Sequence, residues 1–240
     1  RLSDLIERVE PVNWWVEMKT KDLQILVYGN SISDLIPKID NSNVMLNSFE
    51  KVKNENYLFL NISILDNAKP AEIEIDFYRN SVLVDMRIFN LLEREQNASK
   101  VEGFNNSDVM YLITPDRFAN GNPSNDDVKE MYERPNRENN RGLHGGDLQG
   151  IINHLDYIKD LGFTTIWLNP ILENNMKKSS YHGYSITDYY KVDPRFGTND
   201  LFKELSHSAK EMDIKLVMDM IPNHCGSEHW FFKDPPMDDW

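Results

Sequence analysis

The chain has 240 residues, of which 40% are hydrophobic and 27% charged, so it can bury the core of one large domain or of two ordinary ones. Its 39 acidic and 26 basic side chains give a formal net charge of -13. Because this charge repels phosphate groups and anionic lipid, we expect neither a nucleic-acid nor a membrane partner. The single cysteine, Cys225, excludes an internal disulfide and a zinc cluster.

The first hundred residues alternate apolar and polar side chains with the period of half-buried β-strands. Residues 58–64 place Leu or Ile at every second position, and residues 72–77 alternate acidic with apolar side chains. Several short strands separated by turn-rich pieces are typical of a β-sandwich, which we expect to be immunoglobulin-like and to span residues 1–100. The further strands are expected at residues 14–18, 23–28 and 82–88. The polar residues 93–100 form either a linker or a short exposed helix.

Beyond residue 100 the pattern alternates strand and helix, which is typical of a parallel sheet with crossover helices. One helix is expected to begin after Asp147 as N-cap and to end at Gly162. We expect residues 101–240 to form three β/α units, the first part of a (β/α)8 TIM barrel, because a whole barrel takes roughly 250 residues. A larger parent protein is therefore expected. The strands are expected at residues 109–113, 164–168 and 215–218, and the second helix at 199–213.

Two polar segments follow expected strands, where a barrel carries its reacting groups. Asp219-Met220-Ile221-Pro222-Asn223-His224 places an acid, an amide and an imidazole at one strand end, and Tyr181-His182-Gly183-Tyr184 follows the strand before it. Aromatic rings there suit a sugar, whose C–H face packs on a π surface. From composition alone, Tyr184 and Tyr189 are equally well explained as packing aromatics. His224 could be a hydrogen-bonded histidine at a strand end, and we expect Trp167 to lie in the core.

A third segment, residues 120–126, is rich in side-chain oxygen and is followed later by Gly145-Gly146-Asp147. Hard cations such as Ca²⁺ take six to eight oxygens from carboxylates, amides and carbonyls. The other explanation is that the Asn-Gly and Asn-Pro pairs only make turns.

Together these three segments resemble the α-amylase superfamily, glycoside hydrolase family 13, and within it the neopullulanase and cyclomaltodextrinase subgroup. The resemblance covers residues 104–240. It implies substrate contacts by Tyr184, which stacks on the sugar next to the broken bond, by His224, by Asp219 and by His182. It implies structural support from Asn223 and Asp188.

The same resemblance implies a structural Ca²⁺ that takes no part in bond breaking. Asn122 stands where the subgroup more often has Asp, so weaker binding is expected. The implied ligands are Asn120, Asn122, Asn125, Asp126, the Gly145 carbonyl and Asp147.

The implied activity is hydrolysis of α-1,4-glucosidic bonds in starch-derived glucans by a retaining double displacement, with an α-glucan oligosaccharide or cyclodextrin as partner. The family's Arg-x-Asp nucleophile segment and its Glu acid segment are not found, so no catalytic residue is assigned within this chain. We expect an amino-terminal part of an enzyme, inactive by itself. The resemblance also implies a homodimer built by the first domain.

The alternative is a non-catalytic carbohydrate-binding or scaffold protein with an amylase-like fold. A free calcium-binding module explains less, because it leaves the Tyr and His segments without a role. The first residues of the chain lack the apolar core of a secretion signal, and both periplasm and cytoplasm are compatible with the sequence.

Overall fold

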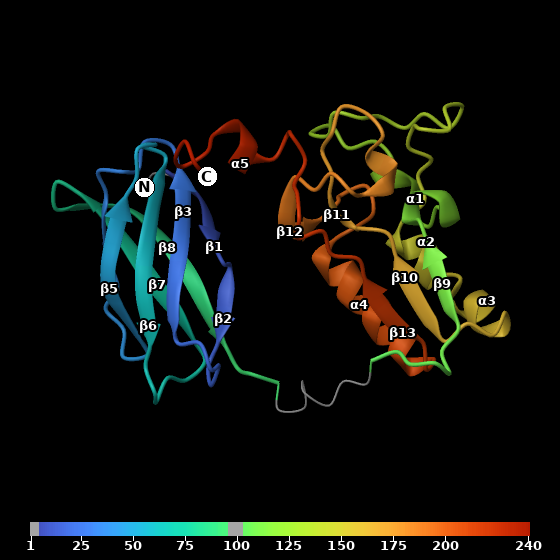
Figure 1. Ribbon diagram of the computed structural model, residues 1–240, viewed down its shortest axis with the longest axis horizontal. Coiled ribbons are helices and arrows are strands. Elements are labelled where there is room, and N and C mark those ends of the chain that lie inside the picture. Colours follow the sequence, from blue (N-terminus) through green and yellow to red (C-terminus); the bar gives the residue numbers. More distant parts are fainter. Residues whose placement is uncertain (1–4, 96–102) are drawn as a thin grey trace. The chain divides into compact units, whose positions relative to one another are not determined.

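The computed structural model describes residues 5–95 and 103–240, and the chain divides into two compact units (Figure 1). The first unit comprises residues 1–101 together with 235–240, and the second comprises residues 102–234. The boundary expected near residue 100 falls among residues 96–102, outside the described residues.

The last residues correct the expected division, because residues 235–240 belong with the first unit. The Asn54 side-chain amide donates to the Pro235 carbonyl at 2.9 Å, and the Asn54 backbone N–H donates to the Pro236 carbonyl at 3.3 Å. The Trp240 ring lies 6.0 Å from the Phe59 ring. These contacts hold the segment against the first unit.

The first unit consists of two four-stranded sheets, with strand orders β1-β3-β6-β5 and β2-β8-β7-β4. All neighbouring strands are antiparallel except β2 and β8, which run parallel. The strands are β1 (Ile6–Glu10), β2 (Asn13–Trp15), β3 (Asp22–Gly29), β4 (Ile36–Lys38), β5 (Val44–Lys51), β6 (Tyr57–Ile64), β7 (Ala71–Arg79) and β8 (Val82–Leu92).

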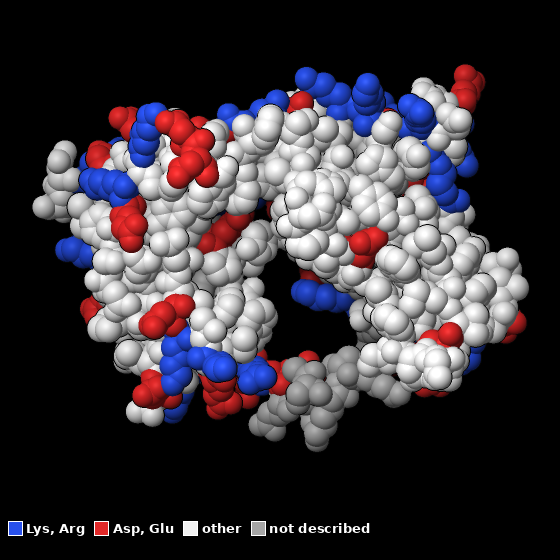
Figure 2. Space-filling view, viewed as in Figure 1, with Lys and Arg blue, Asp and Glu red and all other residues white. Residues whose placement is uncertain are grey.

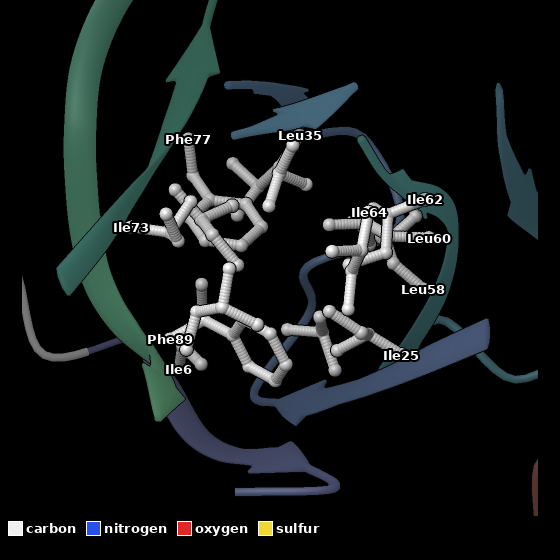
Figure 3. Packing of buried hydrophobic residues seen from close by; sticks show 14 of the residues in the cluster. Ile6, Ile25, Leu35, Leu58, Leu60, Ile62, Ile64, Ile73, Phe77 and Phe89 are labelled. Carbon is white, nitrogen blue, oxygen red and sulfur yellow. The ribbon is translucent and has the colours of Figure 1, made fainter. Parts of the chain in front are cut away.

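The core of this unit is made by the alternate positions that the sequence pattern picks out (Figure 3). Leu58, Leu60 and Ile62 of β6 are fully buried, as are Ile73 and Phe77 of β7. Each such side chain contributes about 1.5–3 kcal/mol when it is removed from water. The period-two prediction for these strands is confirmed.

Strands β1, β4 and β5 were not predicted. In β5 the register shifts between Leu46 and Ser48, and a bulge of this kind interrupts the alternation on which the prediction rests. The strand expected over residues 14–18 ends at Trp15, because Glu17 has a φ of 60°, a left-handed conformation that cannot continue a strand.

In the second unit, three parallel strands form a sheet of order β13-β10-β9, as expected, with ends within one residue of the predicted ones. Ile166 and Leu168 of this sheet share a buried cluster with Leu205 and Ala209 of α4. The strands are β9 (Met110–Ile113), β10 (Thr165–Leu168) and β13 (Lys215–Met218), with a small antiparallel pair β11 (Leu172–Glu173) and β12 (Asp188–Val192). The helices are α1 (Pro115–Phe118), η2 (Pro123–Asn125), α2 (Leu148–Ile152), α3 (Leu155–Asp160), η3 (Ser180–His182), α4 (Asn199–Glu211) and α5 (Trp230–Lys233).

The helix expected from Asp147 to Gly162 is broken into α2 and α3. Its start is confirmed, since the Asp147 side chain accepts from the Gly150 N–H as N-cap. The break comes at His154, whose ring nitrogen Nδ1 lies 2.7 Å from the Gly150 carbonyl and occupies the acceptor that a continuous helix would use. Apolar spacing is the same on both sides of the break and does not reveal it.

Trp167 is 37% exposed, which corrects its expected place in the core. Its neighbours Ile166 and Leu168 take the buried face, so the alternation of β10 turns Trp167 to the opposite face, beside Leu112 of β9. Within the described residues, no helix has both the length and the apolar character needed to cross a bilayer.

Candidate functional site

The parallel strands bring the polar segments to one edge of the sheet. Leu168 and Met218 are register partners at the carboxyl ends of β10 and β13. Asp219 follows Met218 directly, and Tyr184 lies in the connection between β11 and β12, which follows β10 (Figure 1). Carboxyl ends of parallel strands are where ligands bind in sheets of this type.

Tyr184, Asp219 and His224 come together at this edge. The Tyr184 hydroxyl donates to Asp219 Oδ2 at 3.0 Å. His224 Nε2 lies 2.8 Å from the Tyr184 carbonyl, and its Nδ1 lies 2.8 Å from the Asn223 side-chain nitrogen. An imidazole with its proton on Nε2 satisfies both contacts, so Asn223 supports His224. Burial, followed by the hydrogen bond and charge of Asp219, raises the pKa of Tyr184.

His182 lies beside this cluster. The Tyr184 N–H donates to His182 Nδ1 at 2.9 Å, and the two rings are 5.8 Å apart. Burial lowers the pKa of His182, opposed by the charge of Glu133. Gly183 between them has a φ of 79°, and a Cβ there would lie 2.0 Å from the Pro170 carbonyl. Only glycine can therefore make this turn.

Tyr189 has a role that the sequence reasoning missed. Its hydroxyl donates to the carbonyl of Ile221 at 3.1 Å and also contacts the His224 carbonyl, so it holds the loop between Asp219 and His224. Asp188 is buried at the start of β12 and accepts from the Tyr190 N–H. From the sequence alone, a tyrosine that supports a loop through its hydroxyl cannot be distinguished from one that only packs in the core.

The oxygen-rich segment also comes together. The Asn120 amide nitrogen donates to both carboxylate oxygens of Asp126, at 2.8 and 3.0 Å. Gly145 has a φ of 87°, and a Cβ there would lie 2.8 Å from Asp126 Oδ1. The buried Oδ1 atoms of Asn120 and Asn125 accept no hydrogen bond from any described residue. Two orphaned oxygens beside a carboxylate are the kind of donor set that a hard cation uses.

The other two residues expected in that set have further partners. Asp147 is fully buried and accepts from the backbone N–H groups of Gly121, Asn122 and Gly150. The Asn122 side chain caps η2 by accepting from Ser124. Among the described residues there is no group of three or more His, Cys, Asp and Glu suited to a metal ion. The oxygen-rich set does not form such a group, because most of its members are amides.

Two residues that precede the oxygen-rich segment, Asp116 and Arg117, also have defined contacts. Asp116 is buried, accepts from the backbone N–H groups of His144 and Gly145, and pairs with Arg117. Burial raises its pKa, against the lowering effect of those N–H groups. The Arg117 guanidinium lies 4.1 Å from the centre of the Tyr181 ring.

Residues 112–238, more than half of the chain, match the model of the alpha-amylase catalytic domain. The chain belongs to the alpha-amylase family. Residues 8–95 match the model of the cyclomaltodextrinase N-terminal domain. The family resemblance stated from the three segments is therefore confirmed, including its neopullulanase and cyclomaltodextrinase subgroup.

Named relatives agree with this assignment. This alpha-amylase family chain is 44% identical over 128 residues to a cyclomaltodextrinase of Thermoanaerobacter pseudethanolicus, covering 52% of the chain and 21% of the relative. It is 38% identical over 127 residues to neopullulanase 2 of Thermoactinomyces vulgaris, with the same coverage. An Anoxybacillus alpha-amylase crystal structure matches with 48% identity and a TM-score of 0.50, over 55% of this chain and 28% of that one. The chain thus spans about a fifth of the length of these curated relatives.

Proposed function

We propose that Tyr184, Asp219, His224 and His182 form the sugar-contacting part of the active site of an α-glucan hydrolase. The observation that carries the proposal is the Tyr184–Asp219–His224 cluster at the carboxyl edge of the sheet, joined by contacts of 3.0 and 2.8 Å. The 37% exposed Tyr184 offers a ring face and Asp219 a carboxylate at its edge, and His224 would contact a sugar hydroxyl by giving up its hydrogen bond to the Tyr184 carbonyl. The names of the relatives, cyclomaltodextrinase and neopullulanase, support an α-glucan as substrate.

The proposed reaction is retaining hydrolysis of α-1,4-glucosidic bonds, which needs a nucleophilic carboxylate and a carboxylic acid about 5–5.5 Å apart. Asp219 is hydrogen-bonded to Tyr184, and we assign it to positioning. No described residue is assigned as nucleophile or acid, so we propose that these 240 residues alone bind sugar without hydrolysing it. The remaining barrel strands of a longer protein would supply both carboxylates and complete the (β/α)8 barrel.

A titration of the 240-residue chain with maltotriose, followed by NMR, tests the proposal. Signals of Tyr184 and His224 should shift on binding, and Tyr184→Ala should weaken affinity about fivefold through loss of ring contact. Tyr157→Ala is the matched control, because Tyr157 is a 53% exposed tyrosine on α3, away from the site. Equal weakening by the two variants, or no shift at Tyr184, would count against the site.

For the oxygen-rich segment we propose a structural Ca²⁺. Asn120, Asn125, Asp126 and the Gly145 carbonyl would hold it, with Asn122 and Asp147 completing the set. The orphaned oxygens of Asn120 and Asn125 support this, because a buried oxygen without a partner is costly unless a ligand takes it. The ion would fix the loop after β9 and take no part in bond breaking.

For the first unit we propose an immunoglobulin-like sandwich that pairs with a second copy. Ile36 of β4, Tyr78 of β7 and Leu83 of β8 are successive partners across the sheet, and Ile36 and Leu83 are 41% and 38% exposed. A row of apolar side chains on a sheet surface is the kind of patch that marks an interface.

A further inference from the structure

We propose that Glu133 is a positioning residue that sets the conformation of the segment Ser179–Tyr184 for sugar binding; the inference rests on the function proposed above. Glu133 lies in the long connection between β9 and α2, far in sequence from the segment it contacts. Its two carboxylate oxygens accept separate backbone N–H groups, from Ser179 at 3.0 Å and from Ser180 at 2.6 Å. A carboxylate that accepts two N–H groups is a strong, directional clamp.

The clamped segment needs such support because its backbone is bent twice. Ser179 has a φ of 61°, a left-handed conformation that is unfavourable for a residue with a Cβ, and Gly183 has a φ of 79°. Between these two bends lies η3, which ends one residue before Gly183 and leads into Tyr184. The direction of the Tyr184 ring therefore depends on how η3 begins, and that is where Glu133 binds.

The backbone at Glu133 and at the residue before it is held by two hydrogen bonds. The Arg195 guanidinium, which is 3% exposed and paired with buried Asp193, donates to the Glu133 carbonyl at 3.3 Å. Next to it, the Tyr132 N–H donates to the Asn175 side chain at 2.8 Å. These two contacts hold the backbone from which the Glu133 carboxylate extends, which limits the ordering cost of binding.

A second contact acts on the same segment. Arg117 packs on the face of Tyr181, and its Nη2 atom donates to the carbonyls of Asn140 and Gly142, each at 2.9 Å. Both contacts come from the connection that follows β9. The connection after β9 thus shapes the sugar-facing connection after β10.

The test uses Glu133→Gln in the 240-residue chain. Glutamine replaces one of the two carboxylate oxygens with an NH2 group, which cannot accept the N–H that this oxygen held, so amide exchange at Ser179 or Ser180 should accelerate about tenfold or more. Maltotriose affinity should fall at least about threefold although Tyr184 and Asp219 are intact. The pKa of His182 should fall, because the Glu133 charge now raises it against burial. Glu138→Gln, an exposed glutamate of the same connection, is the matched control.

Glu133→Asp separates the effect of the carboxylate charge from that of side-chain length, because aspartate keeps the charge but is one methylene shorter. It should keep the His182 pKa near that of the unaltered chain but still lose amide protection, and it decides the question if the Gln variant does not fold. Unchanged exchange at Ser179 and Ser180 in both variants would overturn the clamp. Faster exchange with unchanged maltotriose affinity would overturn its role in sugar binding. Failure of the proposed function is seen separately, as absence of maltotriose binding by the unaltered chain.

Discussion

Single side chains at the loop edge of the second unit act chiefly by accepting backbone N–H groups. Asp116, Glu133 and Asp147 each accept at least two, from loops or from the first turn of a short helix. A carboxylate in such a position replaces the hydrogen bonds that a strand or helix would supply. Sequence alone identified Asp147 as an N-cap, because the apolar helix pattern begins directly after it.

At the same scale, Asp126 provides the test of the proposed Ca²⁺. Calcium should raise the thermal midpoint of the chain, because an ion at about 100 times its Kd that binds only the folded state stabilises by about 2.7 kcal/mol. Asp126→Asn removes a charge from the ligand set and should abolish most of that gain. Asp127→Asn, at the adjacent exposed residue, should keep it. A thermal midpoint that changes neither with calcium nor with a chelator would contradict the proposed Ca²⁺ site.

Among the elements, β9, β10 and β13 are tied at their amino ends by Asp108. Its carboxylate accepts from Lys215 at 2.9 Å, from Thr164 at 2.8 Å and from the Asn105 N–H at 2.7 Å. The hydrogen bond from Lys215 is the largest cause that lowers the pKa of Asp108 to about 2. One side chain thus links residues at the starts of three parallel strands.

A pH series on Asp108→Asn measures this link. The pKa is lowered on folding, so the stabilisation is fully present above the ordinary value of 3.8 and is lost as pH falls through about 2. The variant should melt below the unaltered chain at neutral pH, and the difference should shrink steadily below about pH 4. Asp160→Asn, an exposed site on α3, should show no such trend. A difference independent of pH would mean that shape, and not charge, matters at Asp108.

For the whole molecule, net charge describes the surface poorly. The formal value is -13, yet basic side chains gather along the upper edge of the second unit in Figure 2, over the loops after β9 and β10. Local charge near those loops is therefore set by which side chains they present. The net charge of the chain therefore does not predict the charge that a partner meets at each part of its surface.

The assembly proposed for the first unit is tested by multi-angle light scattering. Leu83→Asp buries a charge in the proposed interface, so the chain should shift from dimer to monomer. Met45→Asp is the control, because Met45 is 52% exposed on β5 of the other sheet. A monomeric unaltered chain, or an equal effect of both variants, would contradict pairing through the Ile36–Tyr78–Leu83 row.

The sequence by itself determined the features that depend on local periodicity. Alternation over residues 58–64 and 72–77 determined buried strands, and the apolar run before Asp219 determined the strand end at which the candidate site begins. The motifs were specific enough to indicate the family, which the comparisons confirm. The sugar and calcium roles of the motif residues stay predictions.

Only the tertiary structure decided what depends on contacts between distant segments. Glu133 meets Ser179 and Ser180 across 46 and 47 positions, and Tyr189 braces a loop 32 positions away. The break at His154 arises from competition for the Gly150 carbonyl, which leaves apolar spacing unchanged, whereas the bulge in β5 interrupts the alternation itself. Periodicity reports which face of an element is buried, whereas such hydrogen bonds depend on which chain segments the fold brings together.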